Sequence, residues 1–388
     1  MGFSLTKEQL IIQKTAREFA RKELLPKAQQ RDQKGEYPLD SLKKMAELGF
    51  LGMLVPKKYG GMEVDTVSYA LALTEIAYAC ASTAVIMSVH NSLACGCILN
   101  HGTEEQKQKY LVPLAKGEYI GSFALSEPGA GSDPASMATT AKREGDYYIL
   151  NGTKKWITGG ATSYLFIVLA KTNPEHRHKG ISAFIITRDM EGFVTGRKEE
   201  KMGLRASDTT EIIFDNCKVP AENLLGKEGE GFYVAMAGLD AGRIGIAAQS
   251  LGVGMAALDL AVEYSKQRVS SGKPICEHQG LRWMIADMAL DVEAARLLVL
   301  NAAAKKDRNE RCSKEVSMAK LYASEMANRV TASALQIHGG YGYTKKFPIE
   351  RLYRDARAFT IYEGTSQIQK NIIANEVIGD KKKRKNNG

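Results

Sequence analysis

The stretch Glu144-Gly145-Asp146-Tyr147-Tyr148-Ile149-Leu150-Asn151-Gly152 places a short run of aromatic and aliphatic residues between two turn signals. Aromatic and β-branched side chains favour strands, whereas glycine, asparagine and aspartate accept the positive φ of hairpin turns. Similar runs follow at 164–169, 181–186 and 211–214. The pattern predicts an antiparallel sheet or small β barrel in the middle of the chain, with turns at 144–146 and 151–152.

Helical patterns flank this segment on both sides. On the N-terminal side a capping box, Thr6-x-x-Gln9, begins a first helix, which Pro26 is expected to end because proline lacks the N–H that a helix interior needs. Further helices are expected where apolar residues recur at helical spacing, namely at 39–48 and 66–79, after Thr103, at 231–266, 279–306 and 314–338, and after Pro348, with a break at 361–365.

This order of elements predicts the fold class. We expect an α+β protein that is mainly helical, with an N-terminal helical domain at 1–118, a middle β domain at 119–224, and a C-terminal helical bundle domain with a basic tail at 225–388. A large ligand would then lie in the clefts between these domains.

The composition is that of a soluble protein, with 388 residues, 44% of them hydrophobic and 25% charged. The apolar stretches are expected to be too short to span a bilayer, and Met1 is not followed by the pattern of a secretory signal. The expected location is therefore the cytoplasm, or the mitochondrial matrix if a transit peptide was removed. The basic tail at 381–385 accounts for much of the formal charge of +9, and the rest suits an anionic small molecule.

Two familiar kinds of site are not predicted. The six cysteines lack the Cys-x-x-Cys and histidine spacing of zinc sites, so we expect reduced cysteines packed mostly in cores and no metal. The run Gly252-x-Gly254-x-x-Ala257 has the spacing of a dinucleotide fingerprint, but it lies in a helical stretch with no strand before it. Helix packing explains it better.

Three segments are candidates for chemistry. The stretch Phe123-Ala124-Leu125-Ser126-Glu127-Pro128-Gly129-Ala130-Gly131-Ser132-Asp133 joins a strand to a loop of small and hydroxyl residues, which either lets a planar or phosphate-bearing ligand approach or is an ordinary turn. Trp156-Ile157-Thr158 offers an aromatic face and a hydroxyl, or a core tryptophan. Glu363, beside Gly364, is an accessible base or a solvated loop residue.

Together and in this order, these segments resemble the acyl-CoA dehydrogenase family, and the resemblance runs from Thr6 to about Ile378. Further matching segments are Leu239-Asp240-Ala241-Gly242-Arg243, Gln336-Ile337-His338-Gly339-Gly340 and Tyr362-Glu363-Gly364-Thr365. Within the family, the stretches at 240–246 and 87–92 look most like the short-chain, butyryl-CoA branch.

The resemblance implies a helical domain, a β-barrel-like domain and a four-helix bundle in a homotetramer, with electrons passed to an electron-transfer flavoprotein. It implies FAD held by Phe123, Ala124, Leu125, Ser126, Ser132, Trp156, Ile157, Thr158, Gln336, Ile337, His338, Gly339, Gly340, Thr365 and Gln367, with Arg268 and Gln279 reaching a flavin of the neighbouring subunit. It places Ser132, Asp240, Arg243 and Gly364 along the acyl-CoA, and Glu363 as the base that takes the α-proton while the β-hydrogen leaves as hydride.

Two positions depart from the family's pattern. Ser271 stands where the family commonly has an aromatic residue, which bears on cofactor or subunit contacts. Gly242 stands where the isovaleryl-CoA and long-chain branches have a catalytic glutamate, so Glu363 is the only matching base. Alternatives are a branched, dicarboxylic or cyclic substrate, an acyl-CoA oxidase, a basic nucleic-acid-binding flavoprotein on this scaffold, and a helical scaffold without cofactor.

Overall fold

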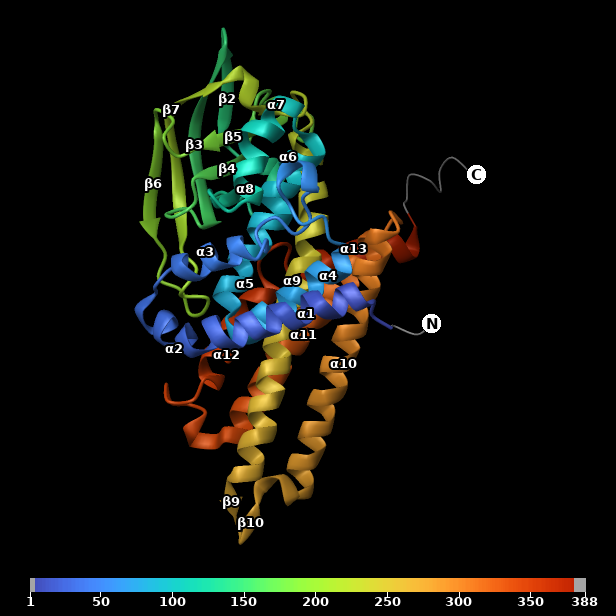
Figure 1. The fold of residues 1–388 in the computed structure, drawn as a ribbon. Helices are drawn as coiled ribbons and strands as arrows, with labels where there is room; N and C mark the ends of the chain where they lie inside the picture. The colour runs from blue at the N-terminus through green and yellow to red at the C-terminus, as the bar shows by residue number, and fades with distance from the viewer. Residues whose placement is uncertain (1–3, 380–388) are drawn as a thin grey trace.

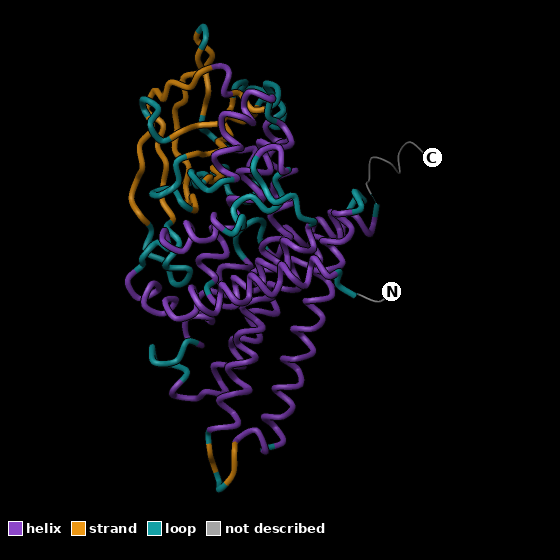
Figure 2. The backbone as a smooth tube through the Cα atoms, viewed as in Figure 1, coloured by secondary structure: helices purple, strands orange, loops and turns teal. Residues whose placement is uncertain are grey.

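The chain forms one sheet at one end and a bundle of long helices at the other, with the N-terminal helices between them (Figure 1). The computed structural model describes residues 4–379, so the basic tail at 381–385 lies outside the described residues. Figure 2 shows most strands gathered in one region, a short two-stranded hairpin at the opposite tip, and helices between them. The expected α+β, mainly helical order is confirmed.

The first helical run is longer than expected. Its capping box is present at Thr6 and Gln9, but the run does not end at Pro26. It continues through α1 (Lys7–Phe19), the π-helical η1 (Ala20–Leu24) and α2 (Leu25–Lys34). Pro26 lies in the first turn of α2, just after the widened π turn, where a missing N–H is tolerated. The expectation that this proline ends the helix is therefore wrong.

The other N-terminal elements include helices where they were expected, at 39–47, 66–79 and from 104 onward, and further elements at 57–59 and 81–101 that were not predicted. They are α3 (Leu39–Glu47), η2 (Lys57–Tyr59), α4 (Thr66–Ala79), α5 (Ala81–Ser88), the π-helical η3 (Val89–Cys95), α6 (Gly96–His101), α7 (Glu104–Gln106), η4 (Lys107–Leu111) and α8 (Val112–Ala115).

The middle segment is a mixed, open sheet. Its elements are β1 (Gly121–Ala124), η5 (Pro134–Ser136), β2 (Thr140–Glu144), β3 (Tyr147–Thr158), β4 (Leu165–Lys171), β5 (Ile181–Thr187), β6 (Phe193–Lys198), β7 (Thr209–Pro220), η6 (Ala221–Asn223) and β8 (Leu224–Leu225). The main path runs β6-β7-β3-β2-β4-β5-β8, and β4 pairs in parallel with both β1 and β2. The described strands thus form neither a purely antiparallel sheet nor a closed barrel, which corrects that expectation.

One of the two expected turns is real. Gly145 and Asp146 connect β2 to β3, with Gly145 at φ 61°. Asn151 and Gly152 instead lie inside β3, where the register against β7 shifts between Leu150 and Gly152. The shift marks a β-bulge, which accommodates the unusual backbone conformation of glycine as a hairpin turn does. The turn predicted at 151–152 is therefore wrong.

The C-terminal segment is built on three long helices. Its elements are α9 (Gly231–Gln267), β9 (Val269–Ser270), β10 (Lys273–Pro274), η7 (Ile275–Glu277), α10 (Gln279–Asp307), α11 (Ser313–His338), η8 (Gly339–Tyr341), α12 (Ile349–Ala356), η9 (Arg357–Thr360) and α13 (Ser366–Ile378). Helices α9, α10 and α11 pack along one another, and α13 packs on α11. Gly252 lies within α9, where a Cβ would stand 2.2 Å from the Thr74 carbonyl oxygen, so helix packing is confirmed for this glycine run.

Two helical runs are long and apolar enough to cross a membrane, contrary to the expectation from the sequence. They are Ala81–His101 and Gly231–Gln267. However, 89% and 78% of their most apolar windows are buried inside the protein, as expected of central helices in a folded core. Their apolar character is therefore used for packing within this fold.

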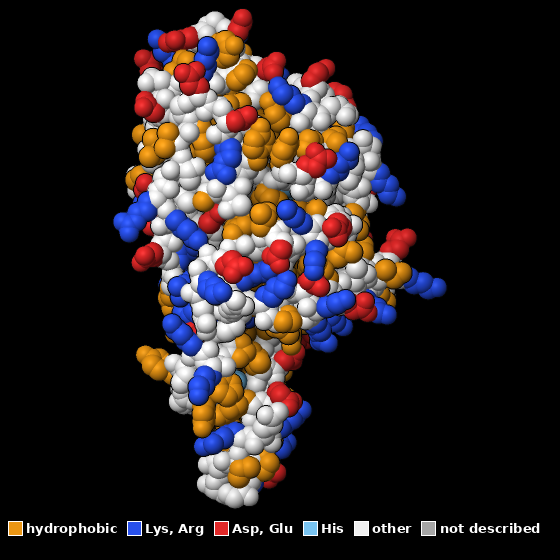
Figure 3. Space-filling model, turned by 60° about the vertical axis from the view of Figure 1, so that its left-hand side comes forward, with side chains coloured by type: hydrophobic (Ala, Val, Ile, Leu, Met, Phe, Trp, Pro, Cys, Tyr) orange, Lys and Arg blue, Asp and Glu red, His pale blue; other side chains and the backbone are white. Residues whose placement is uncertain are grey.

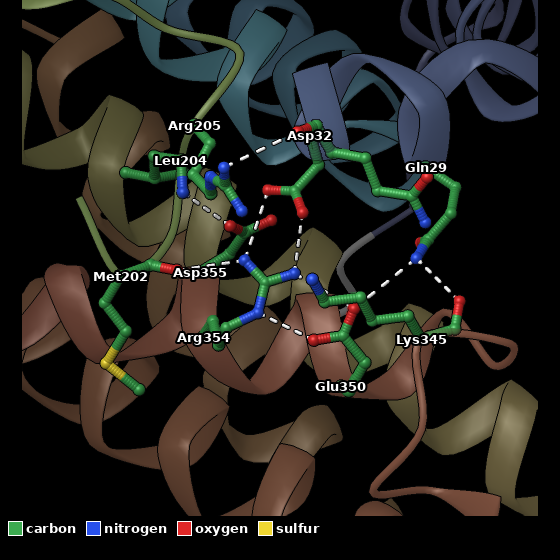
Figure 4. Close-up of polar contacts among 10 residues, drawn as sticks. Gln29, Asp32, Met202, Leu204, Arg205, Lys345, Glu350, Arg354 and Asp355 are labelled. Carbon is green, nitrogen blue, oxygen red and sulfur yellow. Dashed lines mark hydrogen bonds and ion pairs between the residues drawn. The ribbon is translucent and has the colours of Figure 1, made fainter. Parts of the chain in front are cut away.

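A polar network joins all three parts of the chain (Figure 4). The guanidinium of Arg354 on α12 donates to Asp32 on α2 at 2.6 Å and to the carbonyl oxygen of Met202 at 2.9 Å. The neighbouring Asp355 accepts from the backbone N–H of Leu204 at 2.6 Å. The network fixes the C-terminal helices, which carry Glu363, relative to the sheet.

Candidate active site

Glu363 lies at a sharp corner between η9 and α13. Both Glu363 and Gly364 have positive φ, of 50° and 92°, and the Thr365 hydroxyl caps α13 by accepting from the backbone N–H of Ile368. Two buried side chains hold the corner: Lys320 Nζ donates to the Gly364 carbonyl oxygen at 2.8 Å, and Gln369 Nε2 donates to the Glu363 carbonyl oxygen at 3.3 Å. A strained, braced backbone of this kind is typical of functional sites.

The carboxylate of Glu363 points into the protein. Both of its oxygens are buried, and neither has a hydrogen-bond partner among the described residues. A Cβ at Gly242 on α9 would stand 2.3 Å from Glu363 Oε2, so only glycine leaves room for the carboxylate there. The alternative that Glu363 is a solvated loop residue is therefore wrong.

Burial sets the charge state of this carboxylate. Loss of water raises the pKa of Glu363 to about 7, although the positive charges of Lys320 and Arg243 act in the opposite direction. The same burial lowers the pKa of Lys320 to about 8. A carboxylate that titrates near neutrality can accept or release a proton, which suits general base catalysis.

An apolar cluster lies next to the Glu363 corner and packs against the preceding residue, Tyr362. A small cluster is formed by Val85, Val89 and Leu93, with Phe123, Leu239 and Tyr362 packed against it. On the same helix as Gly242, the buried Arg243 donates to Asp240 at 2.5 Å, and its Nε has no partner among the described residues. The structure thus brings Glu363, Arg243, Asp240 and Gly364 together, whereas Ser132 lies on the loop after β1.

A second part of the site is formed by the loop after β1 and the end of β3. Trp156 has φ 66° and is 57% exposed, so the alternative of a core tryptophan is wrong. The backbone N–H of Lys155 donates to the Ser126 carbonyl oxygen at 2.8 Å, which places Phe123–Ser126 beside Trp156–Thr158. A Cβ at Gly129 or Gly131 would meet no atom within 4 Å, so the loop containing Ser132 is open to a ligand.

A buried ion pair underlies this loop. Lys154, fully buried, donates to Glu127 at 2.7 Å and to the Leu125 carbonyl oxygen at 3.1 Å. Glu127 also accepts from the backbone N–H groups of Ala138 and Thr139. Burial lowers the pKa of Lys154 to about 8, and its ammonium in turn helps to hold the pKa of Glu127 below its usual range.

A separate cavity of about 500 Å³ lies where α9 ends and α11 gives way to η8. It is lined by Arg268, Ile337, His338, Gly339 and Gly340, among others. The His338 ring stacks on Tyr264 with centroids 4.3 Å apart, and a Cβ at Gly339 or Gly340 would meet no atom within 4 Å. A guanidinium beside open glycine backbone suits an anionic ligand group.

The residues predicted to hold one cofactor therefore fall into two groups. The 37-residue α9 spans roughly 55 Å at the usual helical rise. Its first residue, Gly231, packs on β5, and Arg268 follows its other end. Figure 1 shows the sheet and the β9–β10 hairpin at opposite ends of the molecule. Within one chain, Phe123–Ser126 and Trp156–Thr158 are thus far from Arg268 and Ile337–Gly340.

The remaining predicted site residues have clear positions. Gln279 is the first residue of α10, Gln336 lies in the last turn of α11, and Thr365 and Gln367 lie at the start of α13. Ser271 has φ 51° and is exposed at the tip of the β9–β10 hairpin. An aromatic side chain there would also project from this tip.

Several residues of the site were not predicted. Lys320 and Gln369 brace the corner, Lys154 and Glu127 support the loop, and Tyr69 and Ser88 carry buried hydroxyls without partners near Gly245. Only the last pair could have been suspected, because a tyrosine and a serine within strongly apolar helical runs are out of pattern.

Comparison with known proteins gives consistent results along the chain. Three family models match, described as acyl-CoA dehydrogenase N-terminal domain at 6–118, middle domain at 122–217 and C-terminal domain at 229–378. A short-chain specific acyl-CoA dehydrogenase of Clostridium acetobutylicum is 47% identical over 97% of this chain and 100% of that protein.

Two solved structures share the fold. That of butyryl-CoA dehydrogenase from Megasphaera elsdenii has a TM-score of 0.96 and 44% identity, covering 98% of this chain and 100% of the other. A chain from a study of the electron transferring flavoprotein of Acidaminococcus fermentans has a TM-score of 0.97 and 46% identity, with 98% and 100% coverage.

Proposed function

Because this chain belongs to the acyl-CoA dehydrogenase family, we propose that it uses FAD to convert a short-chain acyl-CoA to the trans-2-enoyl-CoA. The observation that carries this proposal is the buried carboxylate of Glu363, which faces Gly242, has no hydrogen-bond partner among the described residues and has a pKa of about 7.

The chemistry requires a base in a site without water. A proton next to a thioester carbonyl is far too weakly acidic for a carboxylate in water, so the site must raise the basicity of Glu363 and stabilise the enolate. Burial of the carboxylate raises the basicity of Glu363. Lys320 and Gln369 hold the backbone of the Glu363 corner in place, and a fixed backbone beside the carboxylate helps to stabilise the enolate.

The residues present fit FAD. The exposed face of Trp156 and the open loop at 129–132 suit a flat ring, and Arg268 with Gly339 and Gly340 suits a phosphate-bearing group. When bound, FAD supplies the acceptor for the β-hydrogen, which leaves as hydride. The protein's own residues hold the acyl-CoA, exclude water and take the α-proton.

The proposal predicts a pH dependence of kcat/KM. Because Glu363 must be ionised to act as a base and its pKa is about 7, kcat/KM for butyryl-CoA should rise about tenfold per pH unit below 7 and level off above it. Steady-state rates from pH 5.5 to 9 with an artificial electron acceptor test this. A profile that is flat down to pH 5.5 would contradict the raised pKa.

A second prediction concerns Gly242. A Cβ there stands 2.3 Å from Glu363 Oε2, so Gly242→Ala should displace the carboxylate and lower kcat on the order of 10²-fold, the effect of misplacing a reacting group by about 1 Å. Gly280→Ala is the control, because a Cβ at that helical glycine meets no atom within 4 Å. Equal rates for both variants would show that Gly242 does not position the base.

The substrate is tested by anaerobic titration with butyryl-CoA, octanoyl-CoA and isovaleryl-CoA. Bleaching of the flavin by butyryl-CoA at the lowest concentration supports the short-chain proposal. A yellow protein untouched by every thioester would overturn it. Rapid oxygen consumption during turnover would assign the chain to the oxidases.

The nucleic-acid alternative gains little from the face of the molecule drawn in Figure 3. On the face drawn in Figure 3, acidic and basic side chains are mixed among exposed apolar ones. Binding of that kind should weaken steeply with salt, which a filter-binding series at 50 and 200 mM salt would reveal.

We further propose a homotetramer that passes electrons to an electron-transfer flavoprotein. The two groups of predicted FAD residues at opposite ends of α9 support the first part, because a neighbouring subunit can bring one group to the other. The similar chain from the study of the Acidaminococcus fermentans electron transferring flavoprotein supports the proposed electron acceptor. Light scattering of the purified holoenzyme tests the assembly. The location in the cytoplasm stays a prediction.

A further inference from the structure

Two buried hydroxyls are unexplained by the chemistry above. Tyr69 on α4 is 1% exposed and Ser88 on α5 is fully buried. Neither hydroxyl oxygen has a hydrogen-bond partner among the described residues. An unsatisfied buried hydroxyl costs about 1–3 kcal/mol, so such groups usually mark a water or ligand position.

Both hydroxyls face the same point on α9. A Cβ at Gly245 would stand 2.2 Å from Ser88 Oγ and 3.1 Å from the Tyr69 hydroxyl oxygen. Three elements, α4, α5 and α9, therefore meet at a position where α9 has no side chain.

This position lies one helical turn from the catalytic carboxylate. Gly245 is three residues after Gly242, and side chains at this spacing lie on one face of a helix about 5–6 Å apart. Burial raises the pKa of Tyr69, the adjacent Ser88 hydroxyl acts in the opposite direction, and the nearby charge of Glu363 raises it further. The apolar cluster of Val85, Val89 and Leu93 flanks Ser88 along the chain and packs against Leu239 on α9.

We propose that Tyr69, with Ser88 beside it, forms the end wall of the acyl pocket and limits the length of the acyl chain. The proposal rests on the proposed function, because it assumes that Glu363 contacts the α-carbon of a thioester.

The dimensions support a short chain. An extended acyl chain advances roughly 1.2 Å per carbon–carbon bond. The distance of about 5–6 Å between the side-chain positions of Gly242 and Gly245 therefore equals the length of about four or five such bonds. A four-carbon acyl group ends before the hydroxyls. An eight-carbon group must displace the Tyr69 ring or press its methyl end against two unpaired polar atoms.

The test is a comparison of kcat/KM for butyryl-CoA, hexanoyl-CoA and octanoyl-CoA in Tyr69 variants of the holoenzyme. Tyr69→Ala should raise the octanoyl to butyryl ratio at least tenfold, because each methylene accommodated is worth roughly 10-fold or more. Tyr69→Leu is measured in parallel, since it keeps more of the core volume. Thr83→Val is the matched control, because its hydroxyl is also buried and unpaired on α5. It should leave the ratio unchanged.

Tyr69→Phe separates ring volume from the hydroxyl. The phenylalanine variant should keep the chain-length limit, because the proposed end wall is the ring and Tyr69→Phe retains it. Efficient turnover of octanoyl-CoA by Tyr69→Phe would show that the ring does not set the limit and would overturn the assignment.

The outcomes distinguish the two proposals. If none of the acyl-CoA thioesters bleaches the flavin of the wild-type protein, the proposed function fails. If it prefers butyryl-CoA but neither Tyr69→Ala nor Tyr69→Leu changes the octanoyl to butyryl ratio, the proposed function stands and Tyr69 is not the end wall.

Discussion

Replacement of Glu363 by glutamine is expected to lower turnover of butyryl-CoA by about 10²–10⁴-fold, the usual contribution of a general base. Glutamine has nearly the same shape but cannot accept the α-proton. Because the corner is held through backbone carbonyl oxygens by Lys320 and Gln369, the variant should keep its fold and its flavin. Stopped-flow reduction of the bound flavin under anaerobic conditions measures the loss directly.

The same substitution should make the protein more stable at alkaline pH. The pKa of Glu363 is about 7 in the folded protein and near 4.5 when unfolded, so folding favours the protonated form. The wild type therefore loses stability as the pH rises from about 4.5 through about 7, whereas the glutamine variant does not. At pH 8 the free energy of unfolding of Glu363→Gln should be higher by on the order of 3 kcal/mol, and the difference should shrink toward pH 5.

A second buried carboxylate provides the control. Glu75 is paired with Arg17 at 2.7 Å and lies outside the site. Glu75→Gln should lower the free energy of unfolding and leave turnover of the folded enzyme intact. If Glu363→Gln retained full turnover, or if Glu75→Gln lost as much, the assignment of Glu363 as the base would be wrong.

Much of the fold follows from local sequence signals. The capping box at Thr6 and the apolar periodicity of α9, α10 and α11 act within a few residues, and these helices begin where they were expected. The errors at Pro26 and at Asn151-Gly152 arise from one cause. Proline and glycine report unusual backbone geometry, but a π turn and a bulge satisfy that geometry as well as a helix end or a hairpin.

The site depends on contacts that the sequence does not show. The motif around Glu363 was found through the family resemblance, but its burial depends on the absence of a side chain at Gly242, more than a hundred residues earlier. Lysine is usually exposed, so neither Lys154 within a strand nor Lys320 within a helix was predicted to be buried. Long-range pairing of this kind is a property of the folded chain.

Substitution of Lys154 by methionine is expected to lower the free energy of unfolding by about 3–5 kcal/mol, because it leaves the buried carboxylate of Glu127 without its counter-charge. The substitution should also disturb the segments that are expected to bind FAD, because Lys154 donates a hydrogen bond to the Leu125 carbonyl oxygen and lies two residues before Trp156. We expect weaker FAD binding, measured as the dissociation constant for FAD added to the apoprotein, together with a lower midpoint in urea.

A double-mutant cycle isolates the pair. In Lys154→Met with Glu127→Gln no charge remains buried, and the glutamine oxygen can still accept from the backbone N–H of Ala138 or Thr139, so part of the stability should return. The control is Arg177→Met, at a residue between β4 and β5. It breaks an exposed pair with Asp133 and should cost at most about 1 kcal/mol. If Lys154→Met were no more harmful than Arg177→Met, the loop would be held by its backbone contacts alone, and the buried ion pair would have no part in shaping the cofactor site.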